Sequence, residues 1–251
     1  MSPSSRYMAT VALFVALGGF LMGFDASVIS GVVGFIEVEF SLTKIQVGWS
    51  VSSLALTATL AMMLSGPLSD RIGRRPVLRI AALLFAVSAI LSAVAPSFSW
   101  LVFARMLGGL GVGAALIIAP MYIAEMAPPE SRGRLVSFNQ LNIVIGISVA
   151  YFSNYFLVDL GEDSWRWMLG VEAIPALIYF LALFTVPKSP RWLIQKLNKI
   201  ELARKILVKI GGEEYAEATI VEIQRGLAKK ESKGTLSDLL QRKYATIMII
   251  A

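Results

Sequence analysis

GPLSDRIGRR, residues 66–75, is the stretch that decides the fold of this chain. It separates two long apolar segments and places three arginines beside a single acid, Asp70. Positive charge in the short loops of a membrane protein stays on the cytoplasmic side of the bilayer. The stretch is therefore predicted to be a cytoplasmic turn between two membrane-spanning helices, and it orients the segments on either side.

The composition indicates that the lipid bilayer is the solvent of this chain. Hydrophobic residues make up 56% of the 251 positions and charged residues 16%, with a mean hydropathy of +0.70, whereas soluble domains carry about 25% charged residues. There is no cysteine and no histidine, which excludes disulfides, thiol nucleophiles and imidazole acid–base chemistry, and no metal site is predicted. The net charge of +6 comes from basic residues in loops and in the C-terminal stretch, so nucleic acid is not a predicted partner.

Six apolar segments are long enough to cross a bilayer, which takes about 20 residues each. They lie at residues 7–36, 47–69, 75–94, 100–126, 131–157 and 165–186. The arginines of the connecting stretches gather at one set of ends: Arg6, Arg71, Arg74, Arg75, Arg79, Arg132 and Arg134. This bias predicts a multi-pass protein of the cell membrane whose N-terminus and post-sixth segment are cytoplasmic.

The composition changes after residue 186. Residues 187–243 carry thirteen Lys or Arg against seven Asp or Glu. Apolar residues recur at helical spacing, at Leu197, Ile200, Ala203, Ile206, Leu207 and Ile210. Gly211 and Gly212 interrupt this pattern, and a second helical run is predicted over residues 213–229. Short amphipathic helices against the cytoplasmic face of the bundle are expected, the alternative being a solvated, disordered linker.

Residues 244–251 begin a seventh apolar segment that is too short to span a bilayer. We expect a C-terminally truncated sequence: a six-helix bundle over residues 1–186, a linker over 187–243 and the start of a seventh helix over 244–251.

Four motifs occur in order along the chain: GPLSDRIGRR, then PESRGRL at 129–135, WRWMLG at 165–170 and PKSPRWL at 187–193. Together they resemble the N-terminal half of the sugar porter family within the major facilitator superfamily. Lys188 departs from the family, which usually has an acid there. The resemblance implies an all-α, polytopic fold in which paired three-helix inverted repeats form each six-helix half, and two halves rock about a central site. The C-terminal half is then a partner absent from this sequence.

Two ionisable residues lie inside the apolar segments where an unpaired charge is costly. Asp25 occurs in GFDASVISG of the first segment, and Arg105 lies about one and a half turns into the fourth. These segments run in opposite directions, so both residues are expected in the outer half of the membrane, within reach of each other. The resemblance implies that they are a proton-coupling pair, with the proton as coupling ion and no cofactor; the alternative is a permanent structural salt bridge. A third intramembrane acid, Glu172, is expected either to pair with Arg105 or to reach the lipid headgroups.

The predicted sugar contacts lie on the fifth segment, in SFNQLNIVIGI. A carboxamide offers donors and acceptors to a neutral polyol, and the resemblance implies that Gln140 binds sugar hydroxyls. By helical spacing, Ile143 or Val144 one turn on and Ile147 two turns on share the face of Gln140, and Ile143 and Ile147 are predicted to contact the sugar. The alternative for Gln140 is a hydrogen bond between helices. Asn139 and Asn142 are expected to bridge neighbouring helices, and the glycines of the fourth segment to allow close packing.

A second group of charged residues sits at the cytoplasmic ends of the segments. It consists of Asp70, Arg74, Arg75, Glu125 and Arg132. The resemblance implies a cytoplasmic gate, with Glu125 and Arg132 in a network that pairs with the linker or the other half. Such ion pairs should be neither buried nor strong if they break in each cycle. The alternative is that the arginines only determine topology.

The sequence thus predicts a monosaccharide–proton symporter that works by alternating access in a lipid bilayer. A sugar or polyol uniporter and a membrane sugar sensor are the alternatives. An enzyme is not expected, because there is no nucleophile–base set, phosphate loop or metal cluster.

Overall fold

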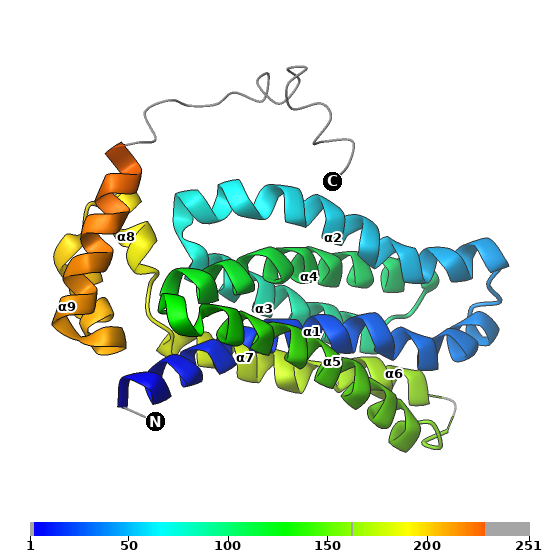
Figure 1. Ribbon diagram of the computed structural model, residues 1–251. Helices are drawn as coiled ribbons and strands as arrows, with labels where there is room; N and C mark the ends of the chain where they lie inside the picture. The colour runs from blue at the N-terminus through cyan, green and yellow to red at the C-terminus, as the bar shows by residue number, and fades with distance from the viewer. Residues whose placement is uncertain (1–2, 162, 229–251) are drawn as a thin grey trace, which may run out of the picture.

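The computed structural model describes residues 3–161 and 163–228, which form helices joined by short connections and contain no strand. The helices are α1 (Pro3–Glu39), α2 (Lys44–Ile72), α3 (Arg74–Ala93), α4 (Phe98–Met126), α5 (Pro129–Leu157), α6 (Ser164–Gly170), α7 (Ala173–Thr185), α8 (Pro190–Leu197) and α9 (Ile200–Ala228). The first seven form an elongated bundle, and α8 and α9 lie at one end of it, beside the N-terminus (Figure 1). The all-α prediction is confirmed.

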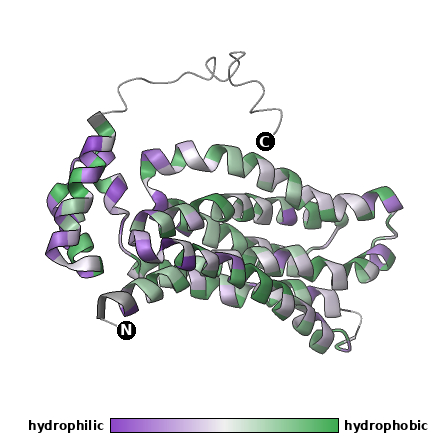
Figure 2. Ribbon diagram, viewed as in Figure 1, coloured by the Kyte–Doolittle hydropathy of each residue, from purple (hydrophilic) through white to green (hydrophobic). Residues whose placement is uncertain are grey.

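Within these residues, six segments are long and apolar enough to cross a membrane, as predicted. They are Arg6–Glu39, Lys44–Ile72, Arg74–Ala93, Phe98–Met126, Pro129–Leu157 and Ser164–Thr185. Figure 2 shows apolar residues along the bundle, with hydrophilic residues gathered at helix ends and over α8 and α9. Backbone groups inside a bilayer must be satisfied within the segment itself, which is why length and hydropathy alone place these helices.

The sixth span, Ser164–Thr185, agrees with the predicted segment and is assigned as α6 and α7. Val171 and Glu172 between them keep right-handed helical angles, with φ of −61° and ψ of −25° and −24°, so the chain does not change direction there. Pro175 has no N–H to donate to the Val171 carbonyl, which accepts from Ile174 instead.

The turn between α2 and α3 is also tighter than expected. α2 continues through Asp70 to Ile72, α3 begins at Arg74, and only Gly73 lies between them. Its φ of 97° is strained for residues other than glycine. A Cβ at this position would also lie 3.2 Å from the Trp192 ring. GPLSDRIGRR is therefore mostly helical, and the change of direction rests on one glycine.

Small residues bring the helices of the bundle into close contact. Gly23 of α1 packs on the backbone of Ile143 in α5, and Gly146 of α5 packs on the backbone of Phe20 in α1. In α4, Gly113 packs in the same way on the backbone of Ala58 in α2. The predicted packing role of the glycines in the fourth segment is confirmed, as association in lipid depends on such close approach.

The region after the bundle is helical where it is described, and the disordered alternative is wrong there. The buried residues of α9 include Ala203, Leu207 and Ile210 of the predicted apolar stripe, whereas Leu197 is 39% exposed. Gly212 has a φ of 86° and interrupts α9, as the predicted glycine break requires. Residue 229, the remaining linker to 243 and the seventh segment at 244–251 lie outside the described residues.

Candidate functional site

Asp25 and Arg105 form an ion pair in the interior of the bundle. Both residues are 2% exposed, and the Arg105 guanidinium donates to the Asp25 carboxylate and, at 3.4 Å, to the Asp25 carbonyl. The pair joins α1 to α4 across 80 positions of sequence. The two side chains meet as the antiparallel segments require.

Small residues around this pair let α3 and α4 approach each other closely. A Cβ at Gly108 would lie 3.1 Å from the Asp25 carboxylate and 2.6 Å from the hydroxyl of Ser88. That hydroxyl donates to the Ala104 carbonyl at 2.8 Å. Gly108 therefore leaves the space that the carboxylate occupies.

Glu172 is the third ionisable group of this region. It lies between α6 and α7 and is 4% exposed. Among the described residues Arg105 forms its ion pair with Asp25, so the expected pairing of Glu172 with Arg105 is not formed in this structure. Glu172 is buried away from the surface, so the expectation that it reaches the lipid headgroups is wrong. Its Oε1 and the Nε of Arg105 are buried and have no hydrogen-bond partner within the described chain. Two carboxylates and one guanidinium thus share a space closed to solvent, and incompletely bonded groups in such a place are costly.

The predicted sugar-contact residues occupy different environments on α5. Gln140 is exposed, whereas Ile143 and Ile147 are half-buried. The Ile143 side chain approaches Gly19 of α1, where an added Cβ would lie 3.1 Å from it. Gln140 therefore points away from the packed helices, and the two isoleucines lie partly against α1.

The expectation for the asparagines of α5 needs correction. The Asn142 amide donates to the Phe138 carbonyl of its own helix at 2.8 Å, and the Asn139 Oδ1 has no partner in the described chain. The amide that does join two helices is that of Asn154, which donates to the Val28 carbonyl of α1 at 3.0 Å. Asn154 stands opposite Gly31, a pairing that sequence spacing alone does not reveal.

The charged groups at the other end of the bundle centre on Arg74. Its guanidinium donates to both oxygens of Glu125 at 2.9–3.1 Å, to the Ser69 carbonyl at 3.0 Å and to Asp70 at 2.8 Å. The side chains of Arg74 and Glu125 are 7% and 8% exposed. The expectation of an exposed, weak pair is wrong here, because the forked guanidinium matches the carboxylate and is shielded from water.

Two residues of PKSPRWL that were not predicted to be functional, Ser189 and Trp192, also bond to this group. The Ser189 hydroxyl donates to Glu125 at 2.5 Å and also accepts from the Trp192 backbone, which makes it the N-cap of α8. The indole of Trp192 donates to the Asp70 carbonyl at 3.0 Å. A serine before Pro and a helical run is a recognisable cap signal, but its carboxylate partner is set only by tertiary structure.

The two remaining predicted gate residues, Arg75 and Arg132, form no bond to Arg74 or Glu125 within the described chain. Arg75 donates to the Val186 carbonyl at the end of α7, at 2.9 Å. Arg132 is exposed and forms no ion pair with the described residues. It lines a cavity of about 440 Å³ between the α4–α5 junction and α9, together with Tyr215. Glu125 lines the same cavity, so both residues of the expected gate network face α9 of the linker, and Glu125 bonds to the linker through Ser189.

Comparison with known proteins agrees with this arrangement. Residues 11–251 match the family described as sugar (and other) transporter. The chain is 41% identical over 255 residues to an arabinose-proton symporter of Bacillus subtilis, covering 99% of this chain and 54% of that protein. It is 38% identical over 259 residues to a D-xylose-proton symporter of Escherichia coli, covering 89% and 52%.

Solved structures lead to the same family. A proton:xylose symporter of the major facilitator superfamily, bound to 6-bromo-6-deoxy-D-glucose, is 37% identical and matches 90% of this chain and 54% of its own with a TM-score of 0.86. The Escherichia coli xylose transporter in a partially occluded inward-open conformation scores 0.85. The chain spans about half the length of the relatives it matches. It belongs to the sugar porter family of the major facilitator superfamily and has the fold of the N-terminal half.

Proposed function

We propose that the protein containing this chain carries a monosaccharide across the cell membrane together with a proton, by alternating access between two halves. The observation that carries the proposal is the buried Asp25–Arg105 pair with Glu172 beside it. Intramembrane charges are costly and are kept mainly where they transport ions or protons. The symporters among the relatives support this proposal, and they also favour a carrier over an enzyme.

The balance of charge suggests how one proton acts. With all three groups ionised, two carboxylates and one guanidinium carry a net charge of −1 in a low-dielectric interior, whereas uptake of one proton makes the cluster neutral. Protonation of Asp25 weakens its bond to Arg105 and thus the polar link between α1 and α4. Glu172, which is buried and has an unpartnered Oε1, is proposed to accept from Arg105 once that bond is weakened. A proton that binds one conformation more tightly than the other biases the equilibrium between them.

The proposed sugar site lies on the face of α5 that the described helices leave open. Gln140 is exposed on that face, and its carboxamide can both donate to and accept from sugar hydroxyls. Ile143 and Ile147, half-buried beside it, are proposed to border the sugar. The second half of the protein is proposed to complete the site and to enclose the substrate.

The Arg74–Glu125 network is proposed to be the part of the cytoplasmic gate that stays joined through the cycle, because a pair this buried is costly to break. It joins α3, α4 and the start of α8, so its formation ties the bundle to the segment leading to the other half. The N-terminus, the α2–α3 turn and α8–α9 share one end of the bundle (Figure 1). Because arginines concentrate at that end, we infer that it faces the cytoplasm.

Transport by the full protein in sealed proteoliposomes tests the proposal. Labelled D-xylose, L-arabinose and D-glucose are offered with and without a one-unit pH gradient, acidic outside. One pH unit corresponds to about 1.4 kcal/mol, so one proton per sugar supports up to about tenfold accumulation of the correct sugar. Asp25→Asn should allow the sugar to equilibrate but not to accumulate, whereas Glu201→Gln, at an exposed position of α9, should behave as wild type.

The two alternatives, a uniporter and a sugar sensor, would each give a different result in this transport assay. Equal uptake with and without the gradient, unchanged by Asp25→Asn, indicates a uniporter and overturns symport. Sugar binding without uptake of any of the three indicates a sensor and overturns transport.

A further inference from the structure

Arg105 is incompletely bonded for an arginine that is buried so deeply. Its Nη1 donates to the Asp25 carboxylate, and the other contacts of the guanidinium are 3.4 Å long, to the Asp25 carbonyl. Its Nε is buried and has no partner in the described chain. A guanidinium carries five N–H donors and no acceptor, and a donor left unbonded away from water costs free energy. Arg105 therefore has room for one more acceptor at Nε.

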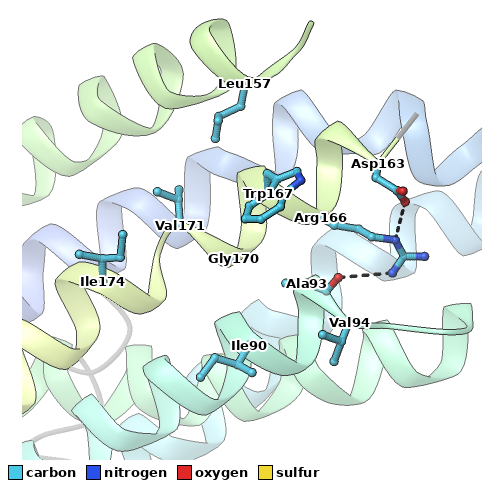
Figure 3. A pocket seen from close by; sticks show the side chains of 10 residues that line it. All are labelled: Ile90, Ala93, Val94, Leu157, Asp163, Arg166, Trp167, Gly170, Val171 and Ile174. Atoms are coloured by element: carbon cyan, nitrogen blue, oxygen red, sulfur yellow. Dashed lines mark hydrogen bonds and ion pairs between the residues drawn. The ribbon is translucent and has the colours of Figure 1, made fainter. Parts of the chain in front are cut away.

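Arg166, at the outer end of the bundle, is bonded through all three of its guanidinium nitrogens. Its Nε donates to Asp163 at 3.0 Å, its Nη1 to the Ala93 carbonyl at 3.3 Å and its Nη2 to Glu39 at 2.8 Å. Figure 3 shows the contacts to Asp163 and Ala93, which fasten the start of α6 to the end of α3. Because α6 is held in this way, we looked for the missing acceptor of Arg105 on the other neighbour of α4, which is α2.

The register of α2 against α4 decides which residue of α2 lies opposite Arg105. A Cβ added to Gly109 of α4 would lie 2.1 Å from the Thr57 Oγ1 of α2. Four residues further on in both helices, a Cβ added to Gly113 would lie 2.8 Å from the Cβ of Ala61. The two helices therefore run in the same direction with a constant register. One turn earlier on each helix, Arg105 comes opposite position 53.

Position 53 holds a serine whose hydroxyl is not bonded. Ser53 is fully buried, and its Oγ has no hydrogen-bond partner in the described chain. A serine or threonine inside a helix often donates to a carbonyl of the preceding turn. The other buried hydroxyl residues of α2 do so: Ser50, Thr57, Ser65 and Ser69. The Ser53 oxygen is thus an acceptor that suits a donor with no partner.

We propose that Ser53 is a positioning residue for proton coupling, which accepts a hydrogen bond from the Arg105 Nε when Asp25 is protonated. This inference rests on the proposed proton symport. With Asp25 ionised, its charge holds the guanidinium toward α1. Once Asp25 carries the proton, that attraction is lost and the guanidinium turns toward α2. The proton itself stays on the Asp25 carboxyl, and Ser53 neither gains nor loses one.

The charges around Asp25 show what removal of the Ser53 hydroxyl would change. Asp25, Arg105 and Glu172 are the charged residues that lie more than two turns from the ends of the described spans. Ser53 is neutral, so its substitution leaves all three charges in place. A bond that forms only after protonation favours the proton-loaded state. Without that bond, a higher proton concentration is needed to load the carrier.

The proton dependence of uptake by the full protein in proteoliposomes tests the proposal. Initial uptake is measured against external pH, with whichever of D-xylose, L-arabinose and D-glucose the wild type accumulates. Ser53→Ala should need about tenfold more protons for half-maximal uptake, a midpoint about one pH unit lower, with the wild-type rate retained at low pH. Ser53→Thr keeps a hydroxyl and should keep the wild-type midpoint. The control is Ser65→Ala, which removes a buried hydroxyl bonded within α2 and should leave the midpoint unchanged.

The outcomes separate this inference from the proposed function. Gradient-driven uptake by the wild type with an unchanged midpoint in Ser53→Ala would overturn the role of Ser53 and leave symport in place. An equal shift in Ser65→Ala, an equal shift in Ser53→Thr, or loss of uptake at every pH in Ser53→Ala would indicate a purely structural hydroxyl and would also overturn it. Wild-type uptake that does not respond to the pH gradient would overturn symport and this inference together.

Discussion

Removal of Glu125 should destabilise the bundle more than removal of an exposed acid, because it leaves a buried arginine charge without its partner. Arg74 and Glu125 are joined by three contacts of 2.9–3.1 Å, and both side chains are less than a tenth exposed. Breaking a buried pair from one side costs about 3–5 kcal/mol. Asp70 cannot replace Glu125, since its side chain is 54% exposed and an exposed pair contributes about 0–1 kcal/mol.

The same geometry predicts that the two single substitutions are not additive. Glu125→Met leaves Arg74 buried with its charge, and Arg74→Met leaves Glu125 with the Ser189 hydroxyl as its remaining bonded partner. The double substitution removes both charges and fills the space with apolar side chains, which is often neutral or stabilising for buried pairs. We therefore expect the double variant to be more stable than either single one, with a coupling energy of about 3 kcal/mol.

Thermal unfolding of the full protein in detergent, followed by tryptophan fluorescence, measures this cycle. With roughly 2–4 °C per kcal/mol, each single variant should unfold on the order of 10 °C below wild type. The Glu37–Lys44 pair is the control: its lysine is 86% exposed, so Lys44→Met should shift the midpoint by less than about 3 °C. If the losses of the two single variants simply sum in the double variant, the account of this pair as one buried unit is refuted.

Two further predictions concern α9. Burial raises the pKa of Tyr215 above its ordinary 10.0, so its contribution to stability is complete below pH 10 and is lost as the pH rises through the folded value. The difference between the absorbance titrations of wild type and Tyr215→Phe isolates this phenol from the other tyrosines and should place its ionisation above pH 10. A difference curve with its midpoint at pH 10 would contradict this. Gly212→Ala should destabilise α9 by at least about 1 kcal/mol because φ there is 86°, and the loss should appear as faster proteolysis within α9. The control is Gly226→Ala in the helical part of α9, which should stabilise this helix by about 0.5–1 kcal/mol. Equal proteolysis of the two variants would contradict the assigned backbone strain.

Much of the candidate site could be anticipated from sequence because charge is rare inside apolar segments. Asp25 and Arg105 stand out for this reason, and opposite helix directions bring them to one depth. The position of Glu172 could not be predicted in the same way. Whether it faces the lipid or the interior depends on which side of the sixth span turns toward the neighbouring helices, and hydropathy and helix direction do not decide that.

The network around Arg74 shows the same limit. The sequence places Asp70, Arg74 and Glu125 at one end of the bundle, yet it does not select Glu125 over Asp70 as the main partner of Arg74. That selection follows from the short turn at Gly73, which directs Arg74 toward α4. Arg132 has the same charge and lies near the same end, but it lines the cavity beside α9 instead.

The sequence by itself determined the six spans, their order and the amphipathic helices that follow. In a bilayer each helix must satisfy its own backbone, so length and hydropathy suffice to locate it. Only the tertiary structure decided which polar side chains meet: Asp25 with Arg105 beside Glu172, Arg74 with Glu125 and Ser189, and Asn154 with α1. These contacts depend on how closely two helices approach and which faces they turn to each other, and small residues such as Gly23, Gly108 and Gly146 set both.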